Sequence, residues 1–314
     1  MKMHKKLLSV VFLVGIAAAG FIYYFKHRED FYLITSVSMS ALVVISSLFI
    51  VISLCFGLQL KILMNHYNLD IGFLECYGLS RTSSFINLLL PIGGGASYKA
   101  IYLKKLLRLR YSSYIASMAI ANIIKIMIFA LAAVFLVMPL GGVLSAVSII
   151  TFSASLLFLL LGHKLKNLDI TSAGYAKKVI DEWQKIKEDR GTITKLACLS
   201  LFVFAATSLS IYLSFRAFSV DISVRAGGTI AAFTTITGLL NIVPGNWGIR
   251  EALFIIISST YGIEINESVH AAALGRLIQI IWTFILASFF RYDFSRITAH
   301  TLTRSSQKKE SSED

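Results

Sequence analysis

The segment LNIVPGNWGIREALF, residues Leu240–Phe254, interrupts a long apolar stretch with residue types that a membrane-spanning helix normally excludes. Proline removes a backbone donor, and glycine permits backbone angles that other residues avoid. Irregular backbone at membrane depth is tolerated only where protein or water surrounds it. We therefore predict two short helices separated by a break that lines an interior site, rather than one helix with a proline kink. The break comprises Pro244, Gly245, Asn246, Trp247 and Gly248.

The composition around this segment is that of an integral membrane protein. The chain has 314 residues, of which 56% are hydrophobic and 15% charged, whereas a soluble domain averages about 25% charged residues. Several apolar runs reach the roughly 20 residues that cross a bilayer. We expect an all-α polytopic membrane protein of about six full spans and two re-entrant or broken hairpins, around 83–103 and 226–262. The spans are predicted near Leu7–Phe25 (as a retained span rather than a signal peptide), Ser38–Leu60, Ser112–Met138, Val143–Gly162, Leu196–Phe215 and His270–Phe290.

The net charge is +13, and the basic residues are distributed unevenly between the two sides of the predicted topology. With a cytoplasmic N-terminus, 23 of the 30 basic residues fall in inner segments, whereas the outer segments hold four basic and five acidic residues. The positive-inside rule then places both termini in the cytoplasm of a multi-pass protein of the cell (inner) membrane. The basic excess predicts affinity for anionic lipid headgroups at the inner face and does not indicate nucleic-acid binding.

A second interrupted segment, LLLPIGGGASYKAIYL (Leu88–Leu103), resembles the first. It contains Pro91 and the glycines Gly93, Gly94 and Gly95. Both segments read Pro-x-x-x-Gly followed by a base, and the predicted topology turns the second copy upside down. Such an inverted repeat is typical of secondary transporters, which bind substrate at interrupted helices. We predict one transmembrane domain over 1–295 with inverted halves of about 1–138 and 139–295, and a polar cytoplasmic tail over 296–314.

The stretch between the halves, Thr171–Arg190, has apolar residues at helical spacing and charges between them. These apolar residues are Val179, Ile180, Trp183 and Ile186. This pattern predicts an amphipathic helix lying on the inner leaflet.

Each break is followed by a base that suits an anion. A helix starting near Gly248 directs free amides and its positive dipole end toward the break, and Arg250 lies in its first turn. Together they form a candidate site for a phosphate or phosphodiester. Glu251 would be a counter-ion, a proton acceptor or a ligand for an amine, and Lys99 takes the place of Arg250 in the first half. The alternative is that Arg250 and Glu251 lie at the membrane interface.

Two further bases lie inside predicted spans, Lys125 and Arg276. A lone charge there costs at least ~2.5 kcal/mol, so such residues usually face a hydrated interior. Lys125 is too deep in its span to reach the membrane surface. Arg276 lies only six residues past His270, so the alternative for Arg276 is that its side chain extends outward to the membrane surface. Asn87 and Asn241 would line the site or hydrogen-bond between helices.

The sequence has no zinc-type spacing, and its Gly-Gly-Gly run lacks the Lys-Ser/Thr of a P-loop. It also has no Ser-His-Asp arrangement. We expect no metal, no cofactor and no enzymatic activity.

The two breaks resemble the flippase-like integral membrane proteins that share the transmembrane region of lysylphosphatidylglycerol synthase. Members have a motif close to Pro-x-Gly-x-Gly-x-Arg-Glu, which PGNWGIRE (Pro244–Glu251) resembles well. In their first motif, proline and Gly-Gly precede an acid and an arginine; here Ala96 stands at the acid and Lys99 at the arginine. The resemblance covers essentially the whole chain.

This resemblance implies a lipid translocase acting on aminoacylated phospholipids or polyprenyl-linked glycolipids. The missing acid at Ala96 favours an anionic, phosphate-bearing headgroup over a cationic one. Without the family's aminoacyl-transferase domain, the chain should not make such a lipid itself. We expect a flippase that binds a membrane lipid and works by alternating access of its halves. The alternatives are a membrane-embedded lipid transferase, and a non-transporting scaffold whose partner is a glycosyltransferase or another lipid-modifying enzyme.

Overall fold

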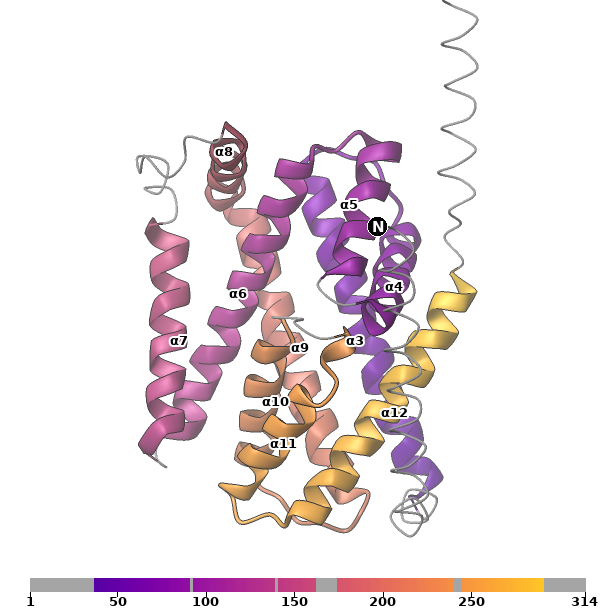
Figure 1. The fold of residues 1–314 in the computed structure, drawn as a ribbon, viewed down its shortest axis with the longest axis vertical. Helices are drawn as coiled ribbons and strands as arrows, with labels where there is room; N and C mark the ends of the chain where they lie inside the picture. The colour runs from indigo at the N-terminus through magenta and orange to yellow at the C-terminus, as the bar shows by residue number, and fades with distance from the viewer. Residues whose placement is uncertain (1–36, 91–92, 139–140, 162–173, 240–243, 291–314) are drawn as a thin grey trace, which may run out of the picture.

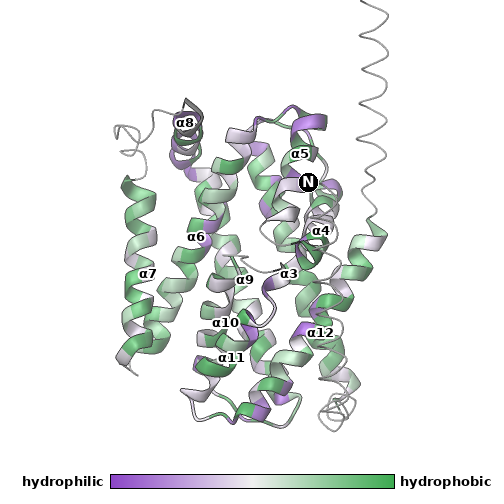
Figure 2. Ribbon diagram, in the orientation of Figure 1, coloured by the Kyte–Doolittle hydropathy of each residue, from purple (hydrophilic) through white to green (hydrophobic). Residues whose placement is uncertain are grey.

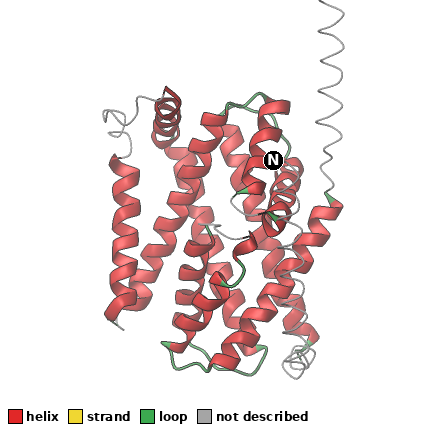
Figure 3. Ribbon diagram, in the orientation of Figure 1, coloured by secondary structure: helices red, strands yellow, loops and turns green. Residues whose placement is uncertain are grey.

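The computed structural model describes residues 37–90, 93–138, 141–161, 174–239 and 244–290, and within these ranges the chain is helical without strands (Figure 3). Five helices of the described ranges are long and apolar enough to cross a membrane. They confirm five of the six predicted spans and the all-α polytopic fold; the first predicted span, Leu7–Phe25, lies outside the described residues. The five are α3 (Met39–His66), α6 (Tyr111–Val137), α7 (Gly142–Leu161), α9 (Arg190–Arg216) and α12 (Ile265–Phe289).

The surface of these helices requires a lipid environment. Hydrophobic residues predominate along α7 (Figure 2), where Val143 is 78% exposed, Ile150 66% and Leu157 57%. A soluble monomer rarely exposes contiguous apolar patches above a few hundred Å². In a bilayer, lipid tails cover this surface, and the apolar exposure carries no penalty.

Four shorter helices form two hairpins. The first consists of α4 (Phe73–Leu89) and α5 (Gly94–Leu107), and the second of α10 (Val224–Gly238) and α11 (Ile249–Ser259), with the 3-10 turn η4 (Pro244–Asn246) between them. The longest, α4, has 17 residues. At ~1.5 Å per residue it falls short of the ~30 Å hydrocarbon core.

The two hairpins point toward each other from opposite ends of the bundle (Figure 1). The α4–α5 hairpin begins and ends at the end where α8 lies, and the α10–α11 hairpin begins and ends at the other. Their tips touch, because η4 packs against α4 and a Cβ on Gly245 would lie 3.1 Å from Leu88 Cδ2. The order helix, hairpin, helix therefore occurs twice, in reversed directions. The division of the whole chain into halves near residue 138 stays a prediction.

Each hairpin is packed into an apolar core of its own. Around the first, Leu60 of α3, Leu79 of α4, Leu103 of α5 and Ile120 of α6 are buried together. Around the second, the corresponding residues are Phe215 of α9, Ile230 of α10, Phe254 of α11 and Ala271 of α12. A third cluster, including Phe129 of α6 and Val203 of α9, joins the two halves. These cores hold the hairpin tips at a fixed place in the interior.

The predicted amphipathic helix is α8 (Gly174–Glu188). Its apolar residues Trp183 and Ile186 are buried in the core of the first half, and the Trp183 ring meets Phe158 edge-to-face at 5.3 Å. The predicted helix is therefore confirmed, with Trp183 and Ile186 covered by the protein itself, and its position on the inner leaflet stays a prediction. Lys177, Lys178 and Lys185 remain exposed.

One side chain at the α8–α9 junction ties the ends of two spans together. The Asp189 carboxylate accepts hydrogen bonds from the Thr192 amide at 3.0 Å and its hydroxyl at 2.7 Å, and it lies 2.7 Å from His66 Nδ1. Asp189 thus caps α9 and links it to the last turn of α3. The hydrogen bonds from His66 and Thr192 hold the pKa of this carboxyl below its usual value.

We expect Asp189→Ala to lower the free energy of unfolding by about 1 kcal/mol, the usual effect of losing an N-cap. A carboxyl with a lowered pKa stabilises the fold at every pH above its ordinary pKa of about 4, and this contribution is lost as pH falls toward the lowered value. Thermal unfolding in detergent at pH 7 measures the effect. The control is Asp221→Ala, which removes an exposed carboxylate paired with Arg216. Equal unfolding midpoints for the two variants would contradict the capping role.

Candidate functional site

The break in the second hairpin has the irregular backbone that its sequence predicts. Gly245 and Asn246 have φ of 57° and 53°, and Gly248, the N-cap of α11, has φ of 81°. The Asn246 side-chain amide donates to the Gly238 carbonyl at 2.8 Å, which fastens the turn to the end of α10. The turn therefore has a defined shape, and α11 starts afresh beside it.

Arg276 of α12 points into this turn. Its side chain is 7% exposed and donates to the Gly245 carbonyl oxygen, and its Nε lies 3.5 Å from Glu251 Oε1. The guanidinium carbon is 4.5 Å from the centre of the Trp247 ring. Arg276 is thus an interior residue, and the alternative in which it extends outward to the membrane surface is wrong.

Arg250 and Glu251 lie in the first turn of α11, as predicted. Arg250 Nη1 donates to Gln279 Oε1 at 2.6 Å, and Arg276 Nη1 approaches the same oxygen at 3.5 Å. Glu251 Oε2 accepts from the Gly248 amide at 2.8 Å. Glu251 therefore caps α11 and also acts as counter-ion, chiefly to Arg276. We call Arg250 and Arg276 the second base cluster.

The break in the first hairpin is packed more tightly. Helix α5 begins after Gly93, whose φ is 71°, and the Gly95 amide donates to Asn87 Oδ1 at 2.7 Å. A Cβ on Gly95 would lie only 2.0 Å from the Ser83 carbonyl oxygen, and one on Gly94 would lie 2.7 Å from Leu90 Cβ. The glycines are required for close approach of α4 and α5, and Asn87 holds the two helices together.

Three bases gather inside the first half. Lys125 of α6 is 4% exposed, donates to Gln59 at 3.2 Å and lies 4.6 Å from the centre of the Phe56 ring. Lys99 of α5 is near enough to Lys125 and to Arg81 of α4 for their charges to interact. Arg81 is 2% exposed, and its guanidinium carbon is 5.6 Å from the Phe56 ring centre. We call Arg81, Lys99 and Lys125 the first base cluster.

The two clusters differ in their counter-charge. Glu251 lies within ion-pair distance of the second base cluster. Among the described residues, no carboxylate lies within that distance of any member of the first. The tips of the two hairpins touch at Leu88 and Gly245, and the Gly245 carbonyl accepts a hydrogen bond from Arg276 of the second base cluster. Each half thus brings two of the predicted bases near each other: Lys99 and Lys125 in the first half, and Arg250 and Arg276 in the second. Pro91 and Asn241 lie outside the described residues, as does the side chain of Pro244.

One member of the first base cluster, Arg81, and two hydrogen-bond partners of the clusters, Gln59 and Gln279, escape sequence reasoning. Arg81 is one of the seven bases counted between Lys61 and Arg110 as inner-segment charges, yet it is buried in the bundle. The sequence does contain an indication that Arg81 is buried, because the apolar stretch FINLLL follows it closely. Gln59 and Gln279 are uncharged and give no comparable signal.

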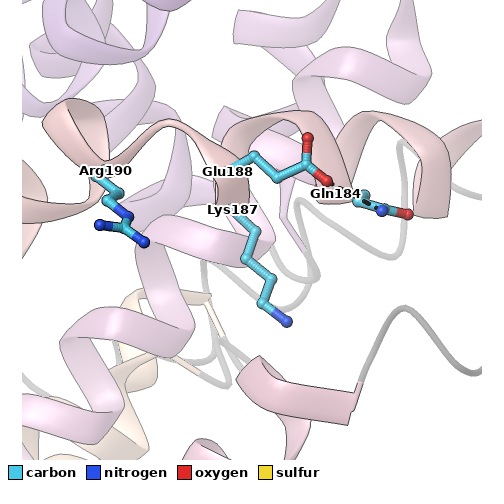
Figure 4. Close-up of a pocket in the computed structure, with 4 residues that line it drawn as sticks. All are labelled: Gln184, Lys187, Glu188 and Arg190. Carbon is cyan, nitrogen blue, oxygen red and sulfur yellow. Dashed lines mark hydrogen bonds between the residues drawn. The ribbon is translucent and has the colours of Figure 1, made fainter.

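The hollow shown in Figure 4 lies elsewhere. It has a volume of about 430 Å³, opens at the α8–α9 junction and is lined by Gln184, Lys187, Glu188 and Arg190. A hydrated chamber between the breaks stays a prediction. Within the described part of the chain, no group of three or more His, Cys, Asp or Glu residues is placed to hold a metal ion.

Comparison with known proteins identifies the family. The sequence model of the lysylphosphatidylglycerol synthase TM region matches residues 7–287. A UPF0104 membrane protein of Methanocaldococcus jannaschii is 21% identical over 267 residues, which cover 76% of this chain and 80% of that protein. A UPF0104 membrane protein of Methanothermobacter thermautotrophicus is 27% identical over 81 residues, which cover 26% of this chain and 24% of that protein.

Proposed function

We propose, from the premise that this chain belongs to the family of the lysylphosphatidylglycerol synthase transmembrane region, that it is a lipid translocase. Its substrate would be a phosphate-bearing lipid: a phospholipid, an aminoacyl-phospholipid or a polyprenyl-linked glycolipid. The protein would lie in the cell (inner) membrane with both termini in the cytoplasm, as the distribution of its bases favours. The bases that remain at the inner end, including those of α8, would attract anionic headgroups.

One observation carries this proposal: two short hairpins enter the bundle from opposite ends, and their tips touch beside buried bases. A hairpin too short to cross the bilayer suits a re-entrant segment, and paired re-entrant segments let one interior site open to either leaflet in turn. A buried base is expensive in a membrane interior and is therefore usually functional. The clusters would hold the lipid phosphate while the two halves move around it.

Arg250 is expected to be essential for transport, because it lies at the start of α11 where free amides and a guanidinium suit a phosphate. Purified protein in liposomes should accelerate the flipping of a labelled phospholipid or polyprenyl phosphate. We expect Arg250→Ala to reduce this rate to that of protein-free liposomes. Arg225→Ala, which removes an exposed arginine from the first turn of α10, should flip at the unmutated rate. Flipping no faster than in empty liposomes, across several lipid classes, would refute the translocase.

The scaffold alternative depends on the exposed basic surface of α8 rather than on the buried bases. The exposed lysines of α8, Lys177, Lys178 and Lys185, would recruit a glycosyltransferase or another lipid-modifying enzyme. In that case, neutralising these lysines would abolish the cellular phenotype, whereas neutralising Lys125 or Arg276 would not. The translocase predicts the opposite result. A lipid transferase would need a nucleophile or general base together with a metal or an acidic pair facing one leaflet. Glu251, an acid at the second break, is already engaged with Gly248 and Arg276.

A further inference from the structure

The first base cluster carries positive charge that no carboxylate of the described residues balances. Arg81 and Lys125 are almost fully buried, and Lys99 lies within electrostatic range of both. Like charges in a poorly solvated interior repel each other strongly, and proteins normally pair them with carboxylates. The second base cluster has such a carboxylate in Glu251, whereas the first has none within ion-pair distance among the described residues. Among the described residues, the first base cluster therefore lacks the neighbouring carboxylate that Glu251 supplies to the second.

One donor of the Arg81 side chain also lacks a hydrogen-bond partner. Its Nε is buried without one in a side chain that is only 2% exposed, whereas the similarly unpartnered Nε of Arg276 lies 3.5 Å from the Glu251 carboxylate. The neighbouring groups are the Phe56 and Tyr77 rings, at 5.6 Å and 5.8 Å from the guanidinium carbon, and neither offers a strong acceptor. An orphaned buried donor requires an explanation, and an absent ligand is one that also accounts for the uncompensated charge. The two observations are independent and point to the same kind of ligand.

We propose that the first base cluster binds a lipid phosphate with two or more negative charges, as in a phosphate monoester or a diphosphate. This inference rests on the proposed function; it specifies the substrate class and a binding role for the first base cluster in addition to that of Arg250. A phosphate monoester carries about −1.5 to −2 charge at pH 7, which matches three bases better than a singly charged phosphodiester does. The guanidinium of Arg81 supplies a planar fork of donors, and the two lysines supply point charges around it.

Binding to the full-length chain in nanodiscs of zwitterionic lipid tests the proposal. Dodecyl phosphate is the monoester probe, dodecylphosphocholine is the diester probe with the same alkyl chain, and inorganic phosphate is the probe without a lipid tail. We expect dodecyl phosphate to bind at least about tenfold more tightly than the other two, and Arg81→Met to weaken it by about tenfold or more. Arg216→Met, an exposed arginine paired with Asp221, should bind within twofold of the unmutated protein.

The unfolding temperature without ligand separates a binding role from a structural one. Removing an uncompensated buried charge should leave this temperature unchanged or raise it. A large decrease with unchanged affinity for dodecyl phosphate would make Arg81 structural and overturn the proposal. Lys125→Met is a second variant, with the same expected loss of affinity.

The remaining outcomes distinguish the site from the transport activity. Inorganic phosphate binding as tightly as dodecyl phosphate would contradict a lipid ligand, and equal binding of dodecylphosphocholine would contradict selection of a multiply charged phosphate. Monoester binding that depends on Arg81, in a protein that flips no lipid in liposomes, would refute the translocase and leave this site established. A protein that flips lipid but binds the monoester no more tightly than the diester would support the translocase and refute this site.

Discussion

Replacing Arg276 with methionine is expected to lower the free energy of unfolding by about 3–5 kcal/mol and to abolish lipid transport. The methionine would leave the Glu251 carboxylate without its cation and the Gly245 carbonyl without its donor, in the turn where the hairpin tips meet. Breaking a buried pair from one side leaves an uncompensated charge, which is more damaging than removing both partners. The same change removes the cation from the Trp247 ring.

Thermal and denaturant unfolding in detergent, together with flipping in liposomes, measure these effects. Arg216→Met is the matched control, because it also removes an arginine from an ion pair, but at the protein surface, where about 0–1 kcal/mol is at stake. Arg276→Met combined with Glu251→Gln should recover part of the stability without restoring transport. If Arg276→Met unfolds like Arg216→Met, Arg276 does not hold the second break together.

Gly95→Ala is expected to destabilise the first hairpin by about 3 kcal/mol and to inhibit transport, because the helix pair has no room for a methyl group. The new Cβ would lie 2.0 Å from the Ser83 carbonyl oxygen, 2.6 Å from the Ser83 hydroxyl oxygen and 2.7 Å from Asn87 Oδ1. A backbone carbonyl cannot move aside as a flexible side chain can, so α4 and α5 must separate. The hydrogen bond from the Gly95 amide to Asn87 would be lost as they do.

Gly72→Ala provides the control for this change. Gly72 caps α4 with an ordinary φ of −64°, and a Cβ there would meet nothing within 4 Å. The two glycine variants thus differ in the space around the added methyl group. We expect Gly72→Ala to unfold and transport like the unmutated protein. Equal unfolding midpoints for the two variants would mean that the α4–α5 contact does not stabilise the fold.

The spans and most of their ends could be predicted from hydropathy, whereas the first turns of α9 and α12 could not. Helix α9 begins at Arg190, six residues before the predicted Leu196, and α12 begins at Ile265 rather than His270. Charged residues lower the hydropathy of these first turns, yet they form helix readily once a cap is present. Asp189 caps α9, and the Glu264 amide donates to Glu267 at the start of α12.

The positions of most of the interior bases could be predicted from the sequence, whereas their contacts could not. Proline and glycine in an apolar run mark a break, and a base inside a span is conspicuous, so Lys125, Arg250 and Arg276 were found. Arg81 counts as an inner-segment charge in the sequence, because a tally of charges along the chain does not show that α4 enters the bundle. The partners Gln59 and Gln279, and the assignment of Glu251 to Arg276, depend on how neighbouring helices pack and leave no pattern along the chain.

The whole account requires that the two hairpins open to opposite sides of the membrane. Single cysteines test this in a variant lacking Cys55, Cys76 and Cys198. One replaces Gly72 at the start of α4, and the other replaces Ile265, which is 63% exposed at the start of α12, beside the end of α11. With a membrane-impermeant maleimide, Gly72→Cys should react only in inside-out vesicles and Ile265→Cys only in right-side-out vesicles. Reaction of both cysteines from the same side would contradict opposed hairpins and, with them, the proposed translocase.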